Sequence, residues 1–179
     1  MTDDDRAADV AEADPSASPV LTPRGSSWFV TLGIAAAVVL LDQLTKAWAV
    51  DALSDGRPRH AFWTLQWNLS FNSGMAFSKG QGVGPIIGLL AVFIIVFIAV
   101  SVRRSGSRML NVAGGFVMGG ALGNLVDRLF RGDGWLHGSV IDFIDFQWFP
   151  IFNVADIGVN VGGALFVLWS IFSPREVPA

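Results

Sequence analysis

The chain has 179 residues, of which 52% are hydrophobic and only 15% are charged, and its formal net charge at pH 7 is −3. A water-soluble domain of this length usually carries more charge, so the composition favours a membrane protein. No basic cluster resembles a nucleic-acid-binding surface, so we expect no nucleic-acid partner. The lack of cysteine excludes disulfides, a thiolate nucleophile and cysteine-ligated metal.

The first 26 residues are acidic and rich in small residues and proline. Such a segment cannot bury enough apolar surface to fold alone, so we expect a disordered tail at 1–26. A secretory signal peptide would begin with basic residues rather than acidic ones, so the first apolar segment is expected to be retained. We predict one membrane domain over 27–173 and a short C-terminal tail over 174–179.

Four segments contain the roughly 20 mostly apolar residues that a membrane-spanning helix needs. They cover about 28–49, 84–103, 109–130 and 153–172. The second carries no charge from Gly80 to Val102, whereas the other three carry ionisable residues near one end. Because charge inside a span is costly, such residues usually mark a pathway, an ion pair or a site. These residues are Asp42, Lys46, Asp127, Arg128 and Asp156.

The order of the spans brings these polar ends together. In an up-down-up-down chain, the carboxyl ends of spans one and three and the amino ends of spans two and four share one membrane face. Both long connections emerge there too. The opposite face holds the two termini and a short turn with Arg103, Arg104 and Arg108, which the positive-inside rule places in the cytoplasm. We therefore expect a multi-pass protein of the cell membrane, with cytoplasmic termini and the polar cluster near the outer face.

Two local patterns refine this architecture. Between Phe62 and Phe77, aromatic and polar residues interleave, and 72–74 (Asn-Ser-Gly) is a turn signal, so we expect a small β-cradle on the bilayer surface. In the third span, glycines recur every four residues as far as Gly123 and lead to Asp127, so the face that packs closely also carries the acid. The predicted fold class is an all-α membrane protein of four transmembrane helices with an extracytoplasmic β-cradle.

Asp142 and Asp156 both lie in apolar surroundings close to the predicted interface. Two neighbouring carboxylates resist ionising together, so one keeps a proton while the other is charged, which is the state an aspartyl peptidase uses. The alternative is that both are structural aspartates that cap a helix or bind loop amides. Asp145 points away from Asp142 in an extended segment, so we expect it to be exposed.

The remaining polar residues allow more than one interpretation. Asp42 and Lys46 are four residues apart and can form an ordinary intrahelical ion pair. Asp127 and Arg128 cannot pair with each other along a helix, so each is expected to meet another segment, for stability or for substrate. Asn153 can orient Asp156 or cap the last helix. The two histidines, in separate loops, make a weak basis for a metal site, and no metal or cofactor is expected.

Five motifs, in order along the chain, resemble those of the lipoprotein signal peptidases (signal peptidase II). Residues 42–46 look like D-x-x-T-K, 72–77 like N-x-G-x-A-F and 119–128 like G-G-x-x-G-N-x-x-D-R. Residues 140–143 and 152–156 are similar to the V-x-D-F and F-N-x-A-D segments that hold the family's catalytic aspartates. One motif alone would be weak, whereas the ordered set is highly specific.

The resemblance implies a membrane aspartyl endopeptidase that cleaves prolipoproteins on the amino side of a diacylglyceryl-modified cysteine, without metal or cofactor. Its partners would be these lipid-modified substrates and membrane lipid, and we expect a monomer. By motif position, the catalytic pair is Asp142 and Asp156. The substrate-binding or site-supporting residues implied are Asn72, Gly74, Asn124, Asp127, Arg128, Asn153, Asp42 and Lys46.

Three features depart from the family pattern: a long acidic tail, Met75 in place of a common alanine, and a glycine-rich segment over 131–139 that looks like a flexible insertion. Two rival functions also remain. A proton-coupled transporter would bury aspartates, but is expected to show interrupted helices and midplane sites. A non-catalytic lipoprotein-binding factor would need the outer groove, but not both Asp142 and Asp156.

Overall fold

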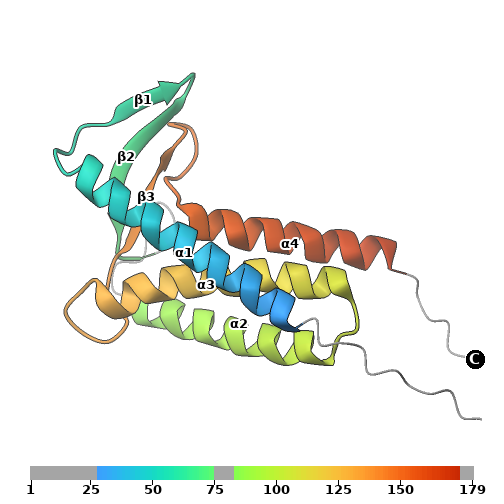
Figure 1. Cartoon of the computed structure of the whole chain (residues 1–179). Coiled ribbons are helices and arrows are strands. Elements are labelled where there is room, and N and C mark those ends of the chain that lie inside the picture. Colours follow the sequence, from blue (N-terminus) through green and yellow to red (C-terminus); the bar gives the residue numbers. More distant parts are fainter. Residues whose placement is uncertain (1–27, 75–82, 174–179) are drawn as a thin grey trace, which may run out of the picture.

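The computed structural model of the protein describes residues 28–74 and 83–173. The predicted tails and the motif residues 75–77 lie outside these ranges. The elements are α1 (Trp28–Ala52), β1 (Arg59–Phe62), β2 (Leu65–Asn72), α2 (Gly84–Arg104), α3 (Arg108–Phe130), β3 (Val140–Asp145) and α4 (Val154–Phe172) (Figure 1). All four helices are long and apolar enough to cross a membrane, so the predicted spans are confirmed to within three residues.

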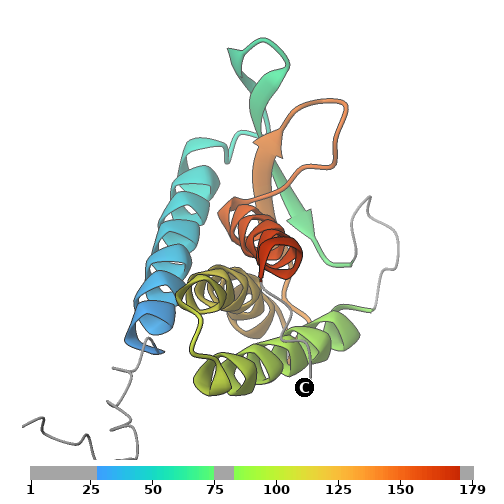
Figure 2. The ribbon, with the colours of Figure 1, turned by 90° about the vertical axis from the view of Figure 1, so that its right-hand side faces the viewer.

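Helix α3 lies at the centre of the bundle and packs against each of the other three helices (Figure 2). In an apolar 18-residue stretch of α3, 56% of the residues are buried, against 17–22% in the corresponding stretches of the other helices. Close approach explains its glycines. A Cβ on Gly119 would lie 2.9 Å from the Ala35 carbonyl of α1, and one on Gly120 would collide with the Ala155 carbonyl of α4. The glycine-rich face therefore packs inward, as the four-residue spacing predicts.

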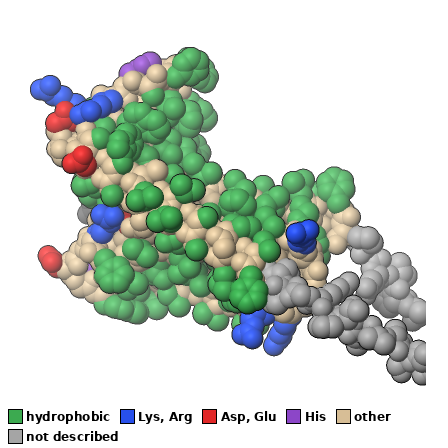
Figure 3. Space-filling model, in the orientation of Figure 1, with side chains coloured by type: hydrophobic (Ala, Val, Ile, Leu, Met, Phe, Trp, Pro, Cys, Tyr) green, Lys and Arg blue, Asp and Glu red, His purple; other side chains and the backbone are tan. Residues whose placement is uncertain are grey.

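The outer faces of the helices carry large apolar side chains. Phe93 and Phe97 of α2 and Val167 of α4 are examples, and green side chains cover much of the helical region in Figure 3. Such a surface suits lipid rather than water. The start of α1, the α2–α3 turn and the end of α4 lie at one end of the bundle, opposite the sheet (Figure 1). The predicted up-down-up-down arrangement is therefore present.

The sheet has three antiparallel strands in the order β1-β2-β3 and extends beyond the helix ends. It brings the first long connection next to the second, with Ser70 opposite Asp142 and Asn72 opposite Val140. An aromatic cluster joins it to the end of α1, since the ring centroid of Trp48 lies 5.6 Å from that of Trp67 and 6.0 Å from that of Phe143. The sheet is thus held at a defined position over the bundle.

The 131–139 segment, expected to be a flexible insertion, is anchored at two points. Leu136 is fully buried with a left-handed backbone (φ 59°), and its side chain packs so closely on α2 that a Cβ on Gly88 would lie 2.8 Å from it. The amide of Gly138 donates a 3.0 Å hydrogen bond to the carbonyl of Arg128. These contacts fasten the loop to the ends of α2 and α3.

Candidate active site

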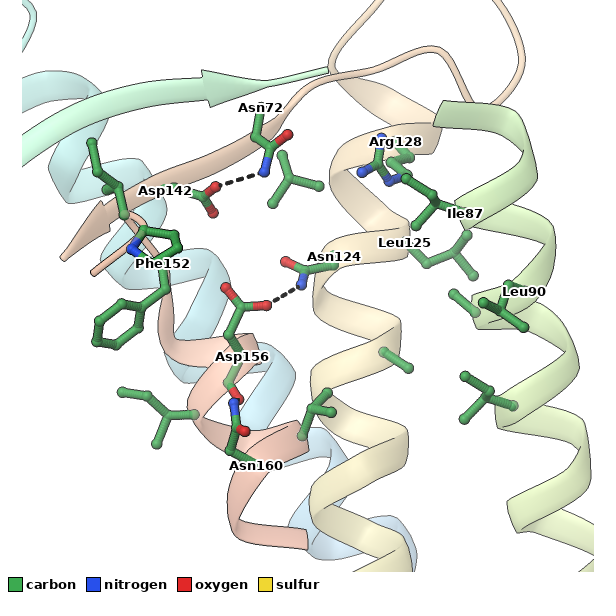
Figure 4. A pocket seen from close by; sticks show the side chains of 18 of the residues that line it. Asn72, Ile87, Leu90, Asn124, Leu125, Arg128, Asp142, Phe152, Asp156 and Asn160 are labelled. Carbon is green, nitrogen blue, oxygen red and sulfur yellow. Dashed lines mark hydrogen bonds between the residues drawn. The ribbon is translucent and has the colours of Figure 1, made fainter. Parts of the chain in front are cut away.

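Asp142 and Asp156 line the same cavity, which has a volume of about 770 Å³ (Figure 4). Asp142 comes from β3 and is only 4% exposed, whereas Asp156 lies in the first turn of α4 and is half-buried. One end of the cavity is polar. The walls farther along α2 and α4 are apolar, with Leu90, Ile94 and Val161 among them. The predicted pair is therefore brought together at the polar end of an otherwise apolar groove.

Both carboxylate oxygens of Asp142 accept hydrogen bonds from side-chain amides. Asn153 donates to Oδ1 at 2.7 Å, and Asn72 donates to Oδ2 at 3.1 Å. The side-chain oxygen of Asn72, Oδ1, in turn accepts a hydrogen bond from the backbone amide of Gly74 at 3.1 Å, and this bond fixes which end of the Asn72 amide faces Asp142. Burial and, second, the charge of Asp156 raise the pKa of Asp142 from 3.8 to about 7.

Asp156 is held by a capping box at the start of α4. Its Oδ2 accepts from the Asn153 backbone amide at 3.1 Å, while the Asn153 side chain accepts from the Asp156 amide at 3.0 Å. Its Oδ1 accepts from the side-chain amide of Asn124 at 2.9 Å. Asn153 thus caps the helix and, through its backbone amide, also holds the Asp156 carboxylate, so the two roles considered for it occur together. Its Nδ2 in addition donates to Asp142.

Three fully buried charged residues lie close to the elements that carry Asp142 and Asp156. The ammonium group of Lys46 is 2.8 Å from Oδ2 of Asp42 and 2.8 Å from Oδ2 of Asp127. The predicted ion pair within α1 is therefore confirmed, as one part of a larger cluster. Asp42 also accepts from the Ala155 amide at 2.9 Å, and Asp127 from the Ile141 amide at 3.1 Å. None of the three charged residues lines this cavity, and their contacts join α1, α3, α4 and β3.

Arg128 also lines the cavity and is 5% exposed. Its Nη2 donates a 3.0 Å hydrogen bond to the carbonyl of Gly74. Its buried Nη1 has no hydrogen-bond partner among the described residues. Asp127 and Arg128 each meet other segments, as their adjacency on one helix predicts. Within the described part of the chain, Arg128 therefore has an unused charged donor and lines the same cavity as the two carboxylates.

Asp145 corrects a prediction. It points away from Asp142 as expected, but it is only 5% exposed, and side chains of the neighbouring strand β2 contact its carboxylate. Its carboxylate accepts from Gln66 at 2.7 Å, from Asn68 at 2.9 Å and from the Gln147 amide at 2.6 Å. Burial by itself would raise the pKa of Asp145, but these three hydrogen bonds hold it below the ordinary value. The alternation of side-chain directions along β3 predicted the face on which Asp145 lies, but not which side chains of the neighbouring strand would contact it.

Two polar residues of the site region were missed by the sequence analysis. Gln43 donates to Asp42, to Asp127 and to the Gly123 carbonyl, each at 3.1 Å. Asn160 lines the cavity one helical turn beyond Asp156. Its four-residue spacing from an acid on one helix face was the available signal. The two histidines are exposed and line no part of this cavity.

The comparisons with known proteins agree with this geometry. The family model described as signal peptidase (SPase) II matches residues 34–172. A lipoprotein signal peptidase of Mycobacterium avium (strain 104) is 44% identical over 142 residues, which cover 79% of this chain and 78% of that protein. The one from Bifidobacterium longum subsp. infantis is 43% identical over 136 residues, covering 75% and 74%. A solved bacterial membrane enzyme aligns with a TM-score of 0.70 and 26% identity, over 84% of this chain and 95% of that one.

Proposed function

Since this chain belongs to the signal peptidase II family and is an aspartic peptidase that removes signal peptides from prolipoproteins, we propose that Asp142 and Asp156 are its catalytic pair. The observation that carries this proposal is their arrangement. The two acids lie on separate elements at the polar end of one apolar groove, and every one of their four oxygens accepts an amide hydrogen bond. Rigidly held carboxylates of this kind suit proton transfer at a fixed position.

The two acids take different roles because their surroundings differ. Asp142 is the more deeply buried, and with its pKa raised to about 7 it carries the proton of the pair below that pH. Asp156 sits at the amino end of α4, where the helix dipole stabilises a negative charge. Ionised Asp156 takes a proton from a water molecule as the water oxygen attacks the scissile carbonyl. Protonated Asp142 donates a hydrogen bond to the carbonyl oxygen.

Collapse of the tetrahedral intermediate breaks the carbon–nitrogen bond, and the leaving amine takes up a proton from the pair. Arg128, whose Nη1 has no hydrogen-bond partner among the described residues, binds a carbonyl of the substrate, and Asn72 and Gly74 line the same cavity. The side-chain amides of Asn124 and Asn153 hold the two carboxylates in place by hydrogen bonds to Asp156 and Asp142. Asp42, Lys46 and Asp127 hold the elements that carry them.

The apolar part of the groove suits a substrate that enters from the membrane. Its walls, from Ile87 to Ile94 on α2 and along α4, match acyl chains better than peptide side chains of mixed polarity. Together with the family, this supports cleavage on the amino side of a diacylglyceryl-modified cysteine, and we propose that the chain acts as a monomer. The turn that carries Arg103, Arg104 and Arg108 lies opposite the sheet. The positive-inside rule then places the termini in the cytoplasm and the dyad near the outer face.

The test is cleavage of a diacylglyceryl-modified prolipoprotein by the purified chain in detergent, followed as a gel shift. Asp142→Asn and Asp156→Asn are each expected to abolish cleavage while the protein remains folded. Asp145→Asn is the matched control, because it is a buried acid of the same strand on the opposite face. An active single mutant at either site would refute the pair. Binding without cleavage by the wild type would favour a lipoprotein-binding factor, and neither activity would favour a transporter.

A further inference from the structure

Asn160 is a polar side chain in the membrane-spanning part of the groove. It lies on α4, four residues after Asp156, so it is about 6 Å farther into the bundle along the helix axis. Both side chains lie on the same face of α4 (Figure 4). The cavity walls at this depth are otherwise apolar, and Leu90, Ile94 and Val161 contribute to them.

The hydrogen bonding of Asn160 is incomplete. Its Nδ2 donates one bond, 2.8 Å long, to the carbonyl of Asp156. The second hydrogen on Nδ2 and the Oδ1 atom have no partner among the described residues, and the side chain is exposed. An amide facing hydrocarbon without partners is costly, and a leucine would fit a lipid-facing helix better. Asn160 therefore gives the groove a hydrogen-bond donor and an acceptor that are unused within the described part of the chain, at a depth where lipid tails cannot form hydrogen bonds.

A substrate does supply a complementary group. A segment bound in the groove in extended form keeps free peptide carbonyls, and the diacylglyceryl group carries ester carbonyls. An extended chain advances about 3.3 Å per residue, so 6 Å corresponds to roughly two residues from the scissile peptide group. A carbonyl at this distance would come level with Asn160 when the scissile bond lies between Asp142 and Asp156.

We infer that Asn160 is a substrate-positioning residue whose side-chain amide donates a hydrogen bond to a carbonyl oxygen of the substrate, about one helical turn deeper in the membrane than the dyad. This inference rests on the proposed function, because it places the scissile bond at Asp142 and Asp156. Asn160 takes no part in proton transfer. It sets the depth at which the substrate is bound, and hence which bond reaches the pair.

The test compares the wild-type chain with Asn160→Leu and Asn160→Gln in steady-state cleavage of a lipidated precursor peptide. Loss of one neutral hydrogen bond is expected to raise KM about five- to tenfold in Asn160→Leu, with kcat within about twofold. Asn160→Gln, which keeps the donor, should recover most of this loss. Val167→Leu, an exposed position of α4 outside the cavity, is the matched control and should leave both constants unchanged.

A second substrate with ether-linked chains, which lacks the ester carbonyls, identifies the source of the carbonyl. If Asn160 binds a peptide carbonyl, Asn160→Leu raises KM equally for both substrates. If it binds an ester, the ether substrate already has the higher KM and Asn160→Leu adds nothing. An unchanged KM with the ester substrate would overturn the inference. A lowered unfolding temperature in Asn160→Leu together with no recovery in Asn160→Gln would also overturn it, because both point to a structural role. Failure of the wild type to cleave would instead refute the proposed function.

Discussion

The ammonium group of Lys46 donates a 2.9 Å hydrogen bond to the side-chain carbonyl of Asn124. An amide has one accepting and one donating end, so this bond turns the Asn124 nitrogen towards Asp156, to which it donates at 2.9 Å. The two remaining hydrogens of Lys46 are directed to Asp42 and Asp127. One buried cation therefore connects the ion cluster of α1 and α3, through a single side-chain amide, to Asp156, one of the two proposed catalytic carboxylates.

Replacing this cation should affect both stability and catalysis. In Lys46→Met, Asp42 remains buried without its positive partner and Asp127 keeps only its 2.8 Å ion pair with Arg131, so we expect the protein to be destabilised by about 3–5 kcal/mol. The Asn124 amide also loses the bond that orients it, so the cleavage rate should fall by about 100-fold or more. Thermal unfolding in detergent and single-turnover cleavage measure the two effects.

Arg59→Met is the control for this substitution. Arg59 pairs with Asp55 at 3.6 Å, and both side chains are about half exposed, so its loss should change stability by less than about 1 kcal/mol. Equal stability of Lys46→Met and Arg59→Met would show that the buried cluster does not hold the helices together.

The cleavage rate should depend on the protonation of Asp142. Because burial and the charge of Asp156 raise the pKa of Asp142 to about 7, the protonated form needed beside the scissile carbonyl is lost above this pH. We expect kcat/KM to decrease about tenfold per pH unit on the alkaline side. A pH–rate profile between pH 5 and 9 measures this, and a rate that increases through pH 7 and 8 would assign the proton to the other acid.

The same pKa makes a separate prediction about stability. The folded protein binds the Asp142 proton more tightly than the unfolded chain does between about pH 4 and 7. Its contribution to the free energy of unfolding is therefore complete below pH 4 and is lost as the pH rises through 7. Asp142→Asn has no such group, so it should be more stable relative to wild type at pH 8 than at pH 4. Paired unfolding curves at the two pH values check the sign.

Asp145→Asn should affect the sheet and spare the chemistry. It replaces a carboxylate that accepts from Gln66, Asn68 and the Gln147 amide, so we expect a loss of about 1–3 kcal/mol in stability. Although burial opposes it, this hydrogen bonding lowers the pKa of Asp145, so its stabilisation is present above the ordinary value of 3.8 and is lost as the pH falls below it. The difference in unfolding free energy between wild type and mutant should shrink below pH 4, while kcat/KM at pH 6 changes less than about threefold.

The amino-acid sequence predicts the spans and the convergence of their polar ends, since hydropathy and alternating direction depend only on chain order. Burial that depends on strand register was not accessible in this way. Asp145 was expected to be exposed because nothing in its own segment indicates that β2 pairs with β3 and places Gln66 opposite it. The link from Lys46 to Asn124 also crosses between helices, whereas the spacing of Asp42 and Lys46 on one helix was enough to predict their ion pair.

Gly120 tests how closely α4 must approach α3 for the dyad to form. A Cβ at this position would collide with the Ala155 carbonyl and lie 2.8 Å from the Val159 side chain, next to Asp156. Gly120→Ala should therefore push α4 outwards, destabilise the protein by about 1–3 kcal/mol and lengthen the bond between Asn124 and Asp156.

Because small displacements of catalytic groups are costly, cleavage by Gly120→Ala is expected to fall by about 100-fold. The matched control is Gly163→Ala on α4, where an added Cβ meets nothing within 4 Å. In that variant alanine's better helix propensity should leave stability unchanged or raise it by up to about 1 kcal/mol, with cleavage unaffected. Full activity in Gly120→Ala would mean that the two acids tolerate a movement of α4. The hydrogen bonds from amide groups to Asp142 and Asp156, rather than helix packing, would then keep the two acids together.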